Sequence, residues 1–410
     1  MSNPAALPQP APRHRAPGPA PAPRAVALPP PVAPPAAAPA PSASLAPLTP
    51  GAPVAAAGSP ARSPQVLLVA PSRSLSFVEH DVAILGRSFG VEVLSRQELP
   101  SRRRLLPALA RRLAAGRFRL VYVWFADPYD TPAILWLARL FRVPAAVVVG
   151  GYELASLPAL GYGALRHRRE RRRVEQVLAR ADALLPTSEL LAGEIRALGG
   201  GARMRVIPPG IDCDLFQPAQ PADGPRERLV VTVATISGAT WKVKGLDVFA
   251  DCARLVPDAR FAILGPCEDE PLAEQLLRSA GGNLEIPGRR LAAGELRDWY
   301  RRAAVYAQLS RRESFGVALA EAMACACVPV AAVAGALPSV VGTTGLLVPP
   351  GRAGEAARAI DLALALAPCG AARQRVMERF GAGRRAGALT AAVRTLIETR
   401  GRELPPEAPA

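Results

Sequence analysis

The sequence predicts an α/β protein made of two doubly wound domains, each with a parallel sheet covered by helices on both faces. Its 410 residues exceed what one hydrophobic core usually organises, and half of them are hydrophobic. Short apolar runs alternate with longer helical stretches, and the runs are continuously apolar, as expected for strands that are buried on both faces. A connector rich in Pro and Asp, residues 211–228, separates two such series.

Each series accounts for one sheet. The first predicts strands at residues 65–70, 91–94, 120–125, 145–150, 183–188 and 205–210. The second predicts strands at residues 229–235, 260–265, 284–288, 305–310, 328–333 and 345–350. We therefore expect two Rossmann-like domains, residues 65–218 and 219–410, and tandem domains of this kind bind ligands where their strand carboxyl ends face each other.

The first 64 residues differ from the rest. They hold 20 of the 45 prolines, together with much alanine, so we expect a disordered or polyproline-like tail that buries no core. The prolines also interrupt any apolar run, so this segment does not resemble a secretory signal. Because no other apolar stretch is long and unbroken enough to span a bilayer, we expect a cytoplasmic protein.

Cysteine and histidine patterns give no sign of a metal site. The cysteines lack a repeated C-x-x-C spacing and nearby histidines, which favours reduced, packed thiols over zinc ligands or disulfides. Of the three histidines, His80 is the only one outside the tail and an arginine cluster, and we expect it on the surface near a helix start. Asp212, Cys213 and Asp214 have the D-x-D form that binds metal–nucleotide complexes elsewhere, but their place in the connector favours a turn.

Two isolated carboxylates stand out in the segment RRESFGVALAEAM. Glu313 and Glu321 are eight residues apart, roughly 12 Å if the segment is helical. A hydrolase pair needs a separation of about 5 to 9.5 Å, so these two are too far apart to act on one bond. Ser314 is the expected N-cap of a helix that begins beside a strand end, where free N–H groups suit a phosphate. The pair would thus fit the two ends of an extended ligand, unless both glutamates are ordinary helix-surface residues.

This segment, followed by VPVAAVAGALPSVVGTTGLLVPP, resembles the E-x7-E region and the turns after it in retaining glycosyltransferases of the GT-B fold, glycosyltransferase family 4. The resemblance covers about residues 65–400 and includes PPGIDCDLF (208–216) and KGLDVFADCARLVPDARFAILG (244–265). It implies two Rossmann-like domains facing across a cleft, with the last helix, about residues 380–400, packing back on the N-terminal domain. It also implies transfer of a hexose from a nucleotide-diphosphate sugar to an acceptor with retention of configuration. Because the D-x-D segment is expected to form a turn, we expect no metal or other cofactor.

The resemblance assigns the donor site to the C-terminal domain. It implies that Glu313 contacts the sugar hydroxyls near the reacting centre, Lys244 the diphosphate and Glu321 the ribose. Further donor-side residues are Ser314, Phe315 and Gly316 of the phosphate-facing turn, and Gly265 at the end of the predicted strand 260–265.

The chain departs from the family pattern at three places. Thr235 stands about where family members carry an arginine, and Lys242 either supplies that charge or is simply solvated. The first strand is followed by APSRSLSFVEHD in place of a Gly-Gly turn, and GGYE replaces a histidine found after a later strand. The expected acceptor-side residues are Gly150, Gly151, Tyr152 and Asp127.

Arginine dominates the charge of the chain. The net charge is +16, from 50 Lys and Arg against 34 Asp and Glu. Two arginine-rich runs, residues 101–119 and 166–173, stand beside expected helices, and the first interleaves its arginines with leucines as a membrane-surface segment does. If the acceptor is a glycan on a lipid carrier or a glycolipid, these runs could bring the protein to an anionic membrane. A solvated arginine-rich face is the simpler interpretation.

Two other classes of function fit parts of the sequence. A basic protein that binds nucleic acid or membranes without catalysis would account for the charge, but aromatic residues make up only 5% and no nucleic-acid-binding motif occurs, so we expect no nucleic-acid partner. A sugar-nucleotide epimerase would share the architecture, but the chain has few histidines for acid–base work. The first strand is not followed by G-x-G-x-x-G, which argues against a nicotinamide site.

Overall fold

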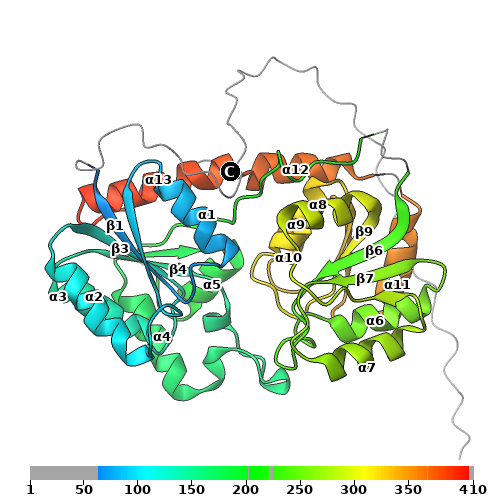
Figure 1. Ribbon diagram of the computed structural model, residues 1–410, viewed down its shortest axis with the longest axis horizontal. Helices are drawn as coiled ribbons and strands as arrows, with labels where there is room; N and C mark the ends of the chain where they lie inside the picture. Colours follow the sequence, from blue (N-terminus) through cyan, green and yellow to red (C-terminus); the bar gives the residue numbers. More distant parts are fainter. Residues whose placement is uncertain (1–62, 202, 221–224, 367, 406–410) are drawn as a thin grey trace, which may run out of the picture. The chain divides into compact units, whose positions relative to one another are not determined.

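The computed structural model describes residues 63–405, apart from residues 202, 221–224 and 367 (Figure 1). All but the last two residues of the tail predicted over residues 1–64 lie outside the described residues.

Among the described residues, the N-terminal sheet has five parallel strands in the order β2-β1-β3-β4-β5. Their bounds, close to those predicted, are β1 Gln65–Ala70, β2 Gly90–Ser95, β3 Phe118–Trp124, β4 Ala145–Val149 and β5 Ala183–Pro186. This is the second common order of doubly wound sheets, with its switch point between β1 and β3.

The prediction of a sixth strand in this series, at residues 205–210, is wrong. Backbone N–H groups of Arg205 and Ile207 bond to carbonyls of β5, but the pairing stops there. Pro208 and Pro209 follow and have no N–H to donate, so they cannot continue a ladder.

Helices cover both faces of the N-terminal sheet. One face packs on α2 Leu105–Ala114, α3 Thr131–Leu140, α4 Arg168–Arg180 and α5 Glu189–Ala197. The other face packs on α1 Ser76–Leu85 and on the last helix, α13 Ala382–Glu398. Leu389, Ala392, Val393 and Leu396 recur at helical spacing on the side of α13 that faces the strands. Short 3-10 turns span η1 Arg102–Arg104, η2 Tyr152–Leu154, η3 Pro158–Leu160 and η4 Ala164–Arg166.

The C-terminal sheet has six parallel strands among the described residues, in the order β11-β10-β9-β6-β7-β8. Their bounds are β6 Glu227–Val233, β7 Arg260–Leu264, β8 Leu284–Glu285, β9 Ala303–Gln308, β10 Val328–Ala332 and β11 Leu346–Val348. This is the dinucleotide-fold order, in which the crevice lies at the carboxyl ends of the two central strands, β6 and β9.

Two groups of helices enclose this second sheet. On one face lie α6 Leu246–Leu255, α7 Glu270–Ala280 and α11 Ala353–Leu364. On the other lie α8 Ala293–Arg302, α9 Val317–Ala324, α10 Leu337–Val341 and α12 Gly370–Phe380. After α12 the chain returns to the first sheet as α13, so the N-terminal domain contains the first sheet, α1–α5 and α13 (Figure 1).

A buried ion pair fastens α13 to this domain. The Arg385 guanidinium, 7% exposed, donates two hydrogen bonds of 2.9 Å to Asp81 on α1, which is fully buried. Tyr122 on β3 donates a third, of 2.7 Å, to the same carboxylate. Arg385 also donates to the carbonyls of Ile207 and Pro208. Each buried charge therefore has several partners, as burial requires.

Candidate functional site

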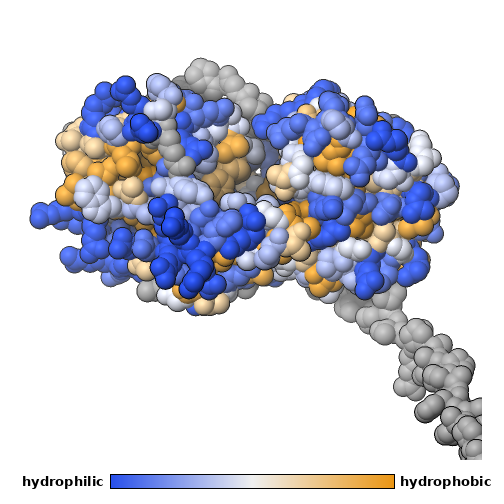
Figure 2. Space-filling model, turned by 90° about the horizontal axis from the view of Figure 1, so that it is seen from below, coloured by the Kyte–Doolittle hydropathy of each residue, from blue (hydrophilic) through white to orange (hydrophobic). Residues whose placement is uncertain are grey.

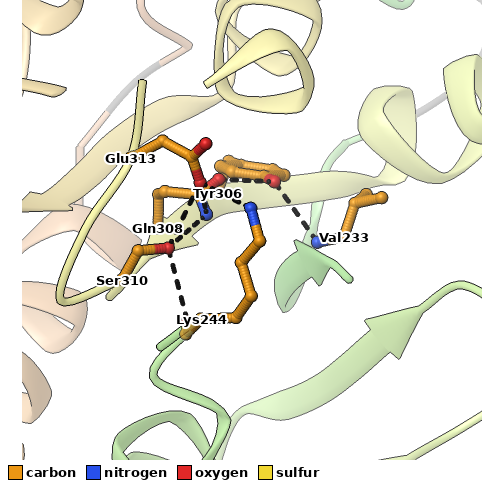
Figure 3. Close-up of polar contacts among 6 residues, drawn as sticks. All are labelled: Val233, Lys244, Tyr306, Gln308, Ser310 and Glu313. Carbon is orange, nitrogen blue, oxygen red and sulfur yellow. Dashed lines mark hydrogen bonds and ion pairs between the residues drawn. The ribbon is translucent and has the colours of Figure 1, made fainter. Parts of the chain in front are cut away.

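A chain of polar side chains runs along the end of β9 to an ion pair (Figure 3). Tyr306 and Gln308 point to the same side of the strand, and the Tyr306 hydroxyl donates to Gln308 Oε1 at 3.1 Å. Gln308 Nε2 donates to Ser310 Oγ at 2.8 Å and, more weakly, to Glu313 Oε2 at 3.4 Å. Lys244 Nζ donates to the same Glu313 oxygen at 2.8 Å.

The Lys244–Glu313 pair is partly shielded but open to a ligand. The side chains are 35% and 15% exposed, respectively. The Glu313 carboxylate raises the pKa of Lys244 above its ordinary value, although burial works in the opposite direction. Lys244 is therefore a cation at neutral pH, with N–H donors available for a second anion.

A close backbone approach brings Lys244 to β9. Gly245 has a φ of +71°, and a Cβ there would lie 2.0 Å from the carbonyl oxygen of Leu309. Only glycine fits this position, so the segment before α6 lies directly against the end of β9. The Ser310 hydroxyl, 3.4 Å from the Lys244 carbonyl, adds a second contact.

The turn that carries Glu313 differs from the prediction. Ser314 is not an N-cap: α9 begins at Val317, and its N-cap is Gly316, with a φ of +94° and no side-chain cap. Glu313 therefore precedes the helix, and a separation based on helical rise does not apply to it. Phe315 is buried and packs edge-on against Phe380, with ring centroids 5.0 Å apart; Gly316 is also buried, and Ser314 is partly exposed.

A second turn supports Glu313 from behind. The Ala336 N–H donates to the Glu313 carbonyl at 2.9 Å. Gly335 has a φ of +60°, and a Cβ there would lie 2.0 Å from the same oxygen. The glycine after β10 is thus needed for the close approach of the two turns.

Glu321 lies on α9, where the Tyr300 hydroxyl donates to it at 3.3 Å. Burial raises the pKa of Glu321 to about 7, and the Tyr300 hydrogen bond opposes the rise. Tyr306 is close enough to both Glu321 and the Lys244–Glu313 pair to be affected by the charges of the two carboxylates. Burial above all raises the pKa of Tyr306, and the charges of both Glu313 and Glu321 add to the rise.

The end of β4 meets the Glu313 turn. A Cβ on Gly151, whose φ is +122°, would lie 1.7 Å from Ser314 Oγ. The predicted acceptor-side and donor-side residues are thus brought into contact at this point. Tyr152 is 51% exposed and stacks edge-on against Tyr162, with ring centroids 5.2 Å apart. Burial raises the pKa of Tyr162, and the charges of Lys244 and Glu313 also act on it, so this ring lies near the ion pair.

A buried carboxylate organises the β4 turn. Glu153, 2% exposed, accepts backbone N–H bonds from Gly150 at 2.9 Å, Gly151 at 2.8 Å and Ala126 at 3.2 Å. These donors come from the ends of two neighbouring strands, β3 and β4. Burial raises the pKa of Glu153, while the three backbone bonds work in the opposite direction. Glu153 therefore fixes the conformation of the glycine turn that faces Ser314.

Other predicted residues lie outside this cluster of contacts. Lys242 is exposed, and its ammonium stands over the Trp241 ring, 5.1 Å from the centroid. Gly265 follows β7. A Cβ at this position would lie 2.4 Å from the carbonyl oxygen of Ala234, so the close approach of the two segments requires glycine. Asp127 follows β3, and its carboxylate accepts the Tyr129 N–H at 3.0 Å.

The remaining chemistry-bearing residues have plain structural positions. His80 is exposed on α1. Asp212 accepts the N–H groups of Asp214 and Leu215 at 3.1 and 2.9 Å, which is turn geometry. The six cysteines are free thiols. In the described part of the chain, no cluster of three or more His, Cys, Asp or Glu side chains could hold a metal ion, and no helix is long and apolar enough to cross a membrane.

Several residues of the site were not predicted. Gln308 and Ser310 had a signal, because polar residues at alternate positions near the end of an apolar strand indicate a crevice. Glu153 had a weaker one, as a lone acid in an apolar stretch. Arg312, which pairs with Glu194 of α5, had none, because its partner lies 118 residues away.

Two sequence families match adjoining parts of the chain. Residues 56–215 match the family described as Glycosyltransferase Family 4, and residues 228–365 match Glycosyl transferases group 1. The second match contains the Lys244–Glu313 pair and Glu321, and the first contains Glu153.

Curated relatives include D-inositol 3-phosphate glycosyltransferases. The protein of that name from Xylanimonas cellulosilytica is 35% identical over 184 residues, 41% of this chain and 44% of the relative. The one from Mycobacterium bovis is 34% identical over 229 residues, 51% of this chain and 46% of the relative. The matches thus span somewhat less than half the length of these relatives.

Solved structures share the fold at low sequence identity. A sucrose-phosphate synthase from Thermosynechococcus elongatus superposes with a TM-score of 0.68 at 18% identity, covering 82% of this chain and all of that one. The Anabaena protein HepE, solved with UDP and with UDP-glucose, gives 0.65 and 0.64 at 18% identity, covering 81% of this chain and all of that one. With its two parallel-sheet domains and both family matches, the chain belongs to glycosyltransferase family 4 and has the GT-B fold.

Proposed function

We propose that the protein transfers a hexose from a nucleotide-diphosphate sugar to an acceptor, with retention of anomeric configuration. The observation that carries this proposal is the Lys244–Glu313 pair at the carboxyl end of β9, opposite the Gly151 turn. Lys244 would bind the diphosphate, where negative charge grows as the sugar leaves. Glu313, held by Lys244 and Gln308, would accept hydrogen bonds from the sugar hydroxyls.

The donor is the better supported substrate. Glu321, whose charge acts on Tyr306 as that of Glu313 does, would accept hydrogen bonds from the ribose hydroxyls. Since the Anabaena structures of the same fold contain UDP and UDP-glucose, UDP is the first nucleotide to test. Lys242 would take little part, because its ammonium is exposed over Trp241. The proposal requires no metal or other cofactor.

The acceptor would bind against the N-terminal domain, beside Gly150, Gly151, Tyr152 and Asp127. A glycan or glycolipid is the acceptor class that we favour. The names of the curated relatives make a phosphorylated cyclitol the second candidate.

We further propose that the N-terminal domain contacts an anionic membrane at its cytoplasmic face. Helix α3 contacts both α2 and α4, and its Trp136 and Leu140 are each 61% exposed. The neighbouring helices α2 and α4, and the turn η1 before α2, carry exposed arginines: Arg103, Arg104, Arg111, Arg169, Arg172 and Arg173. Figure 2 shows strongly hydrophilic residues gathered over one face of this domain, beside apolar patches. Apolar side chains among arginines suit an interfacial contact.

The donor assignment is tested by calorimetric titration of the full-length protein with UDP, GDP, ADP and NAD. We expect one nucleoside diphosphate to bind in the micromolar range, and Lys244→Ala and Glu321→Ala each to weaken it at least about tenfold, or about 1.4 kcal/mol. Lys242→Ala is the matched control and should bind as the unmodified protein does. If no nucleotide binds, or if all three variants behave alike, the proposed site is wrong.

An epimerase and a transferase give different products from the same donor. Incubated with UDP-glucose alone, a transferase releases UDP slowly by hydrolysis, whereas an epimerase converts the donor into an isomeric UDP-sugar. Chromatography that separates the two UDP-hexoses distinguishes them. Accumulation of the isomer would replace the transferase proposal.

A further inference from the structure

A polar pocket opens at the carboxyl ends of β1 and β2, outside the cluster around Lys244. Its volume is about 350 Å³. Every residue that lines it is polar or charged, including Ser72, Ser74, Ser95, Gln97, Arg73 and Glu98. In open α/β sheets, ligands bind at this end of the strands. The pocket therefore lies where a ligand is expected, and part of its lining comes from the segment APSRSLSFVEHD that follows the first strand.

One buried hydroxyl in this pocket lacks a partner. Ser95 is the last residue of β2 and is 1% exposed. Its Oγ has no hydrogen-bond partner among the described residues. Buried hydroxyls in folded proteins almost always have a partner, and an unpaired one destabilises the fold. The missing hydrogen bond can be supplied by a water molecule or by a ligand that enters the pocket.

The chemistry of the pocket suits a neutral ligand rich in hydroxyls. Arg73 pairs with Glu98 at 3.3 Å, so its positive charge is balanced within the pocket. Ser72 and Ser74 lie 3.0 Å apart, Oγ to Oγ, and both can donate and accept. Glu79, in the first turn of α1, adds a negative charge that disfavours a phosphate. Hydroxyl, amide and carboxylate groups together match a sugar ring.

The pocket is distant from the proposed reaction centre along the sheet. The order β2-β1-β3-β4 places three strand intervals between β2 and β4, roughly 14 Å at about 4.8 Å each. The β4 end is the part of this sheet that meets the Glu313 turn, through Gly151 and Ser314. One hexose ring cannot reach from the β4 end to Ser95.

We infer that the acceptor contains several sugar rings, and that this β1–β2 pocket binds a neutral sugar unit distant from the one that is glycosylated. This inference rests on the proposed transferase function and narrows its acceptor to an oligosaccharide or an oligosaccharide-bearing lipid. Ser95 would hydrogen-bond a ring hydroxyl, and Gln97 would bond its neighbours.

Saturation-transfer NMR on the full-length protein tests this inference, with maltotriose, isomaltotriose, cellotriose and mannotriose as probes and their monosaccharides as controls. Titrations are run with and without UDP. We expect at least one trisaccharide to bind more tightly than its monosaccharide. Ser95→Ala should weaken that binding about two- to tenfold, the effect of one hydrogen bond, and Gln97→Ala should weaken it similarly.

Two further readouts separate the pocket from general damage. Ser95→Ala should melt at the same temperature or higher, because it removes an unpaired buried hydroxyl, and should leave UDP binding unchanged. Ser279→Ala, which removes an exposed hydroxyl bonded to Leu276, is the control and should bind every probe normally.

The inference is overturned if no trisaccharide binds, or if Ser95→Ala and Gln97→Ala both bind trisaccharides as the unmodified protein does. Loss of UDP binding is a separate result. A protein that binds no UDP would contradict the proposed function, while the titrations without UDP would still decide whether the pocket binds a sugar chain.

Discussion

Arg312 and Glu194 form a two-pronged ion pair between the Glu313 turn and α5. Nη1 lies 2.9 Å from Oε1, Nη2 lies 2.7 Å from Oε2, and the side chains are 16% and 26% exposed. Arg312 directly precedes Glu313, so this pair joins the proposed donor site to the N-terminal domain. Together with the approach of Gly151 to Ser314, it fixes the spacing between the two sides of the site.

Reversing both charges of this pair should restore the stability that is lost when only one charge is reversed. We expect Arg312→Glu to lower the melting temperature, because it faces Glu194 with a like charge, and the double variant Arg312→Glu/Glu194→Arg to recover most of the loss. A double-mutant cycle should give a coupling of about 1 to 3 kcal/mol. The exposed helical pair Arg278–Glu274, 70% and 68% exposed, is the control and should couple by only about 0.3 to 0.5 kcal/mol. A coupling no larger than this control would show that the pair does not hold the site together.

Removing the charge of Lys244 should slow sugar departure more than it weakens donor binding. With saturating UDP-glucose, Lys244→Met should reduce the rate of UDP release about 10²- to 10³-fold, as loss of a donor to a developing anion does. Lys244→Arg keeps the charge and should retain more activity. Lys242→Met provides the comparison and should stay near the unmodified rate. Equal losses for Lys242→Met and Lys244→Met would remove the distinction between these two lysines.

The partly buried carboxyl group of Glu321 predicts a pH-dependent stability. Its pKa rises from an ordinary 4.5 to about 7 through burial, so between these pH values the folded protein binds more protons than the unfolded chain. Stability from this group therefore falls as pH rises through this range, and the whole penalty applies above pH 7. Glu321→Gln should remove a penalty of up to about 3 kcal/mol at pH 8 and change little near pH 4.5.

Urea unfolding at the two pH values measures this difference. Glu274→Gln, at an exposed position, should change stability equally little at both. The same gain for Glu321→Gln at pH 4.5 and at pH 8 would mean that the carboxyl group is not responsible.

The strands were predictable because a parallel sheet buried on both faces requires continuously apolar runs, and Leu67 or Val231 can hardly be placed elsewhere. The same rule gave the wrong prediction of a strand at residues 205–210, because Val206 and Ile207 are apolar and β-branched. The two prolines that follow them prevent strand pairing. The helix at Ser314 was predicted from composition. Gly316, with its left-handed backbone, delays the start until Val317, and propensity alone cannot reveal this.

The site residues that could be predicted are those that lie together in one short stretch of sequence. Glu313 and Glu321 belong to a single stretch, and Lys244 stands in a second stretch of recognisable pattern. Contacts between distant segments, such as Arg312 with Glu194 or Glu153 with the Ala126 N–H, depend on how the strands and helices pack. The orphaned Ser95 hydroxyl is likewise visible only once β2 has been placed beside β1.

Glu153 should control the acceptor side through the backbone. Glu153→Gln keeps the size but turns an amide NH₂ toward N–H groups of Gly150, Gly151 or Ala126, leaving a buried donor unpaired. We expect a loss of about 1 to 3 kcal/mol in the free energy of unfolding, and faster hydrogen exchange at Gly151 and Tyr152. Glu398→Gln, at the exposed end of α13, should have no effect on either. Unchanged exchange at the β4 turn would show that Glu153 does not position it.

Breaking the Arg385–Asp81 pair should release α13 from the N-terminal domain. Arg385→Met leaves the fully buried Asp81 with only Tyr122 as a donor among the three bonds it accepts, and should cost about 3 to 5 kcal/mol. The double variant Arg385→Met/Asp81→Leu removes both charges and should be more stable than Arg385→Met alone, because no uncompensated charge stays buried. Urea unfolding gives the free energies, and hydrogen exchange over α13 shows whether the helix has come loose. If the double variant is the less stable of the two, the ion pair contributes net stability of its own rather than only neutralising a buried charge.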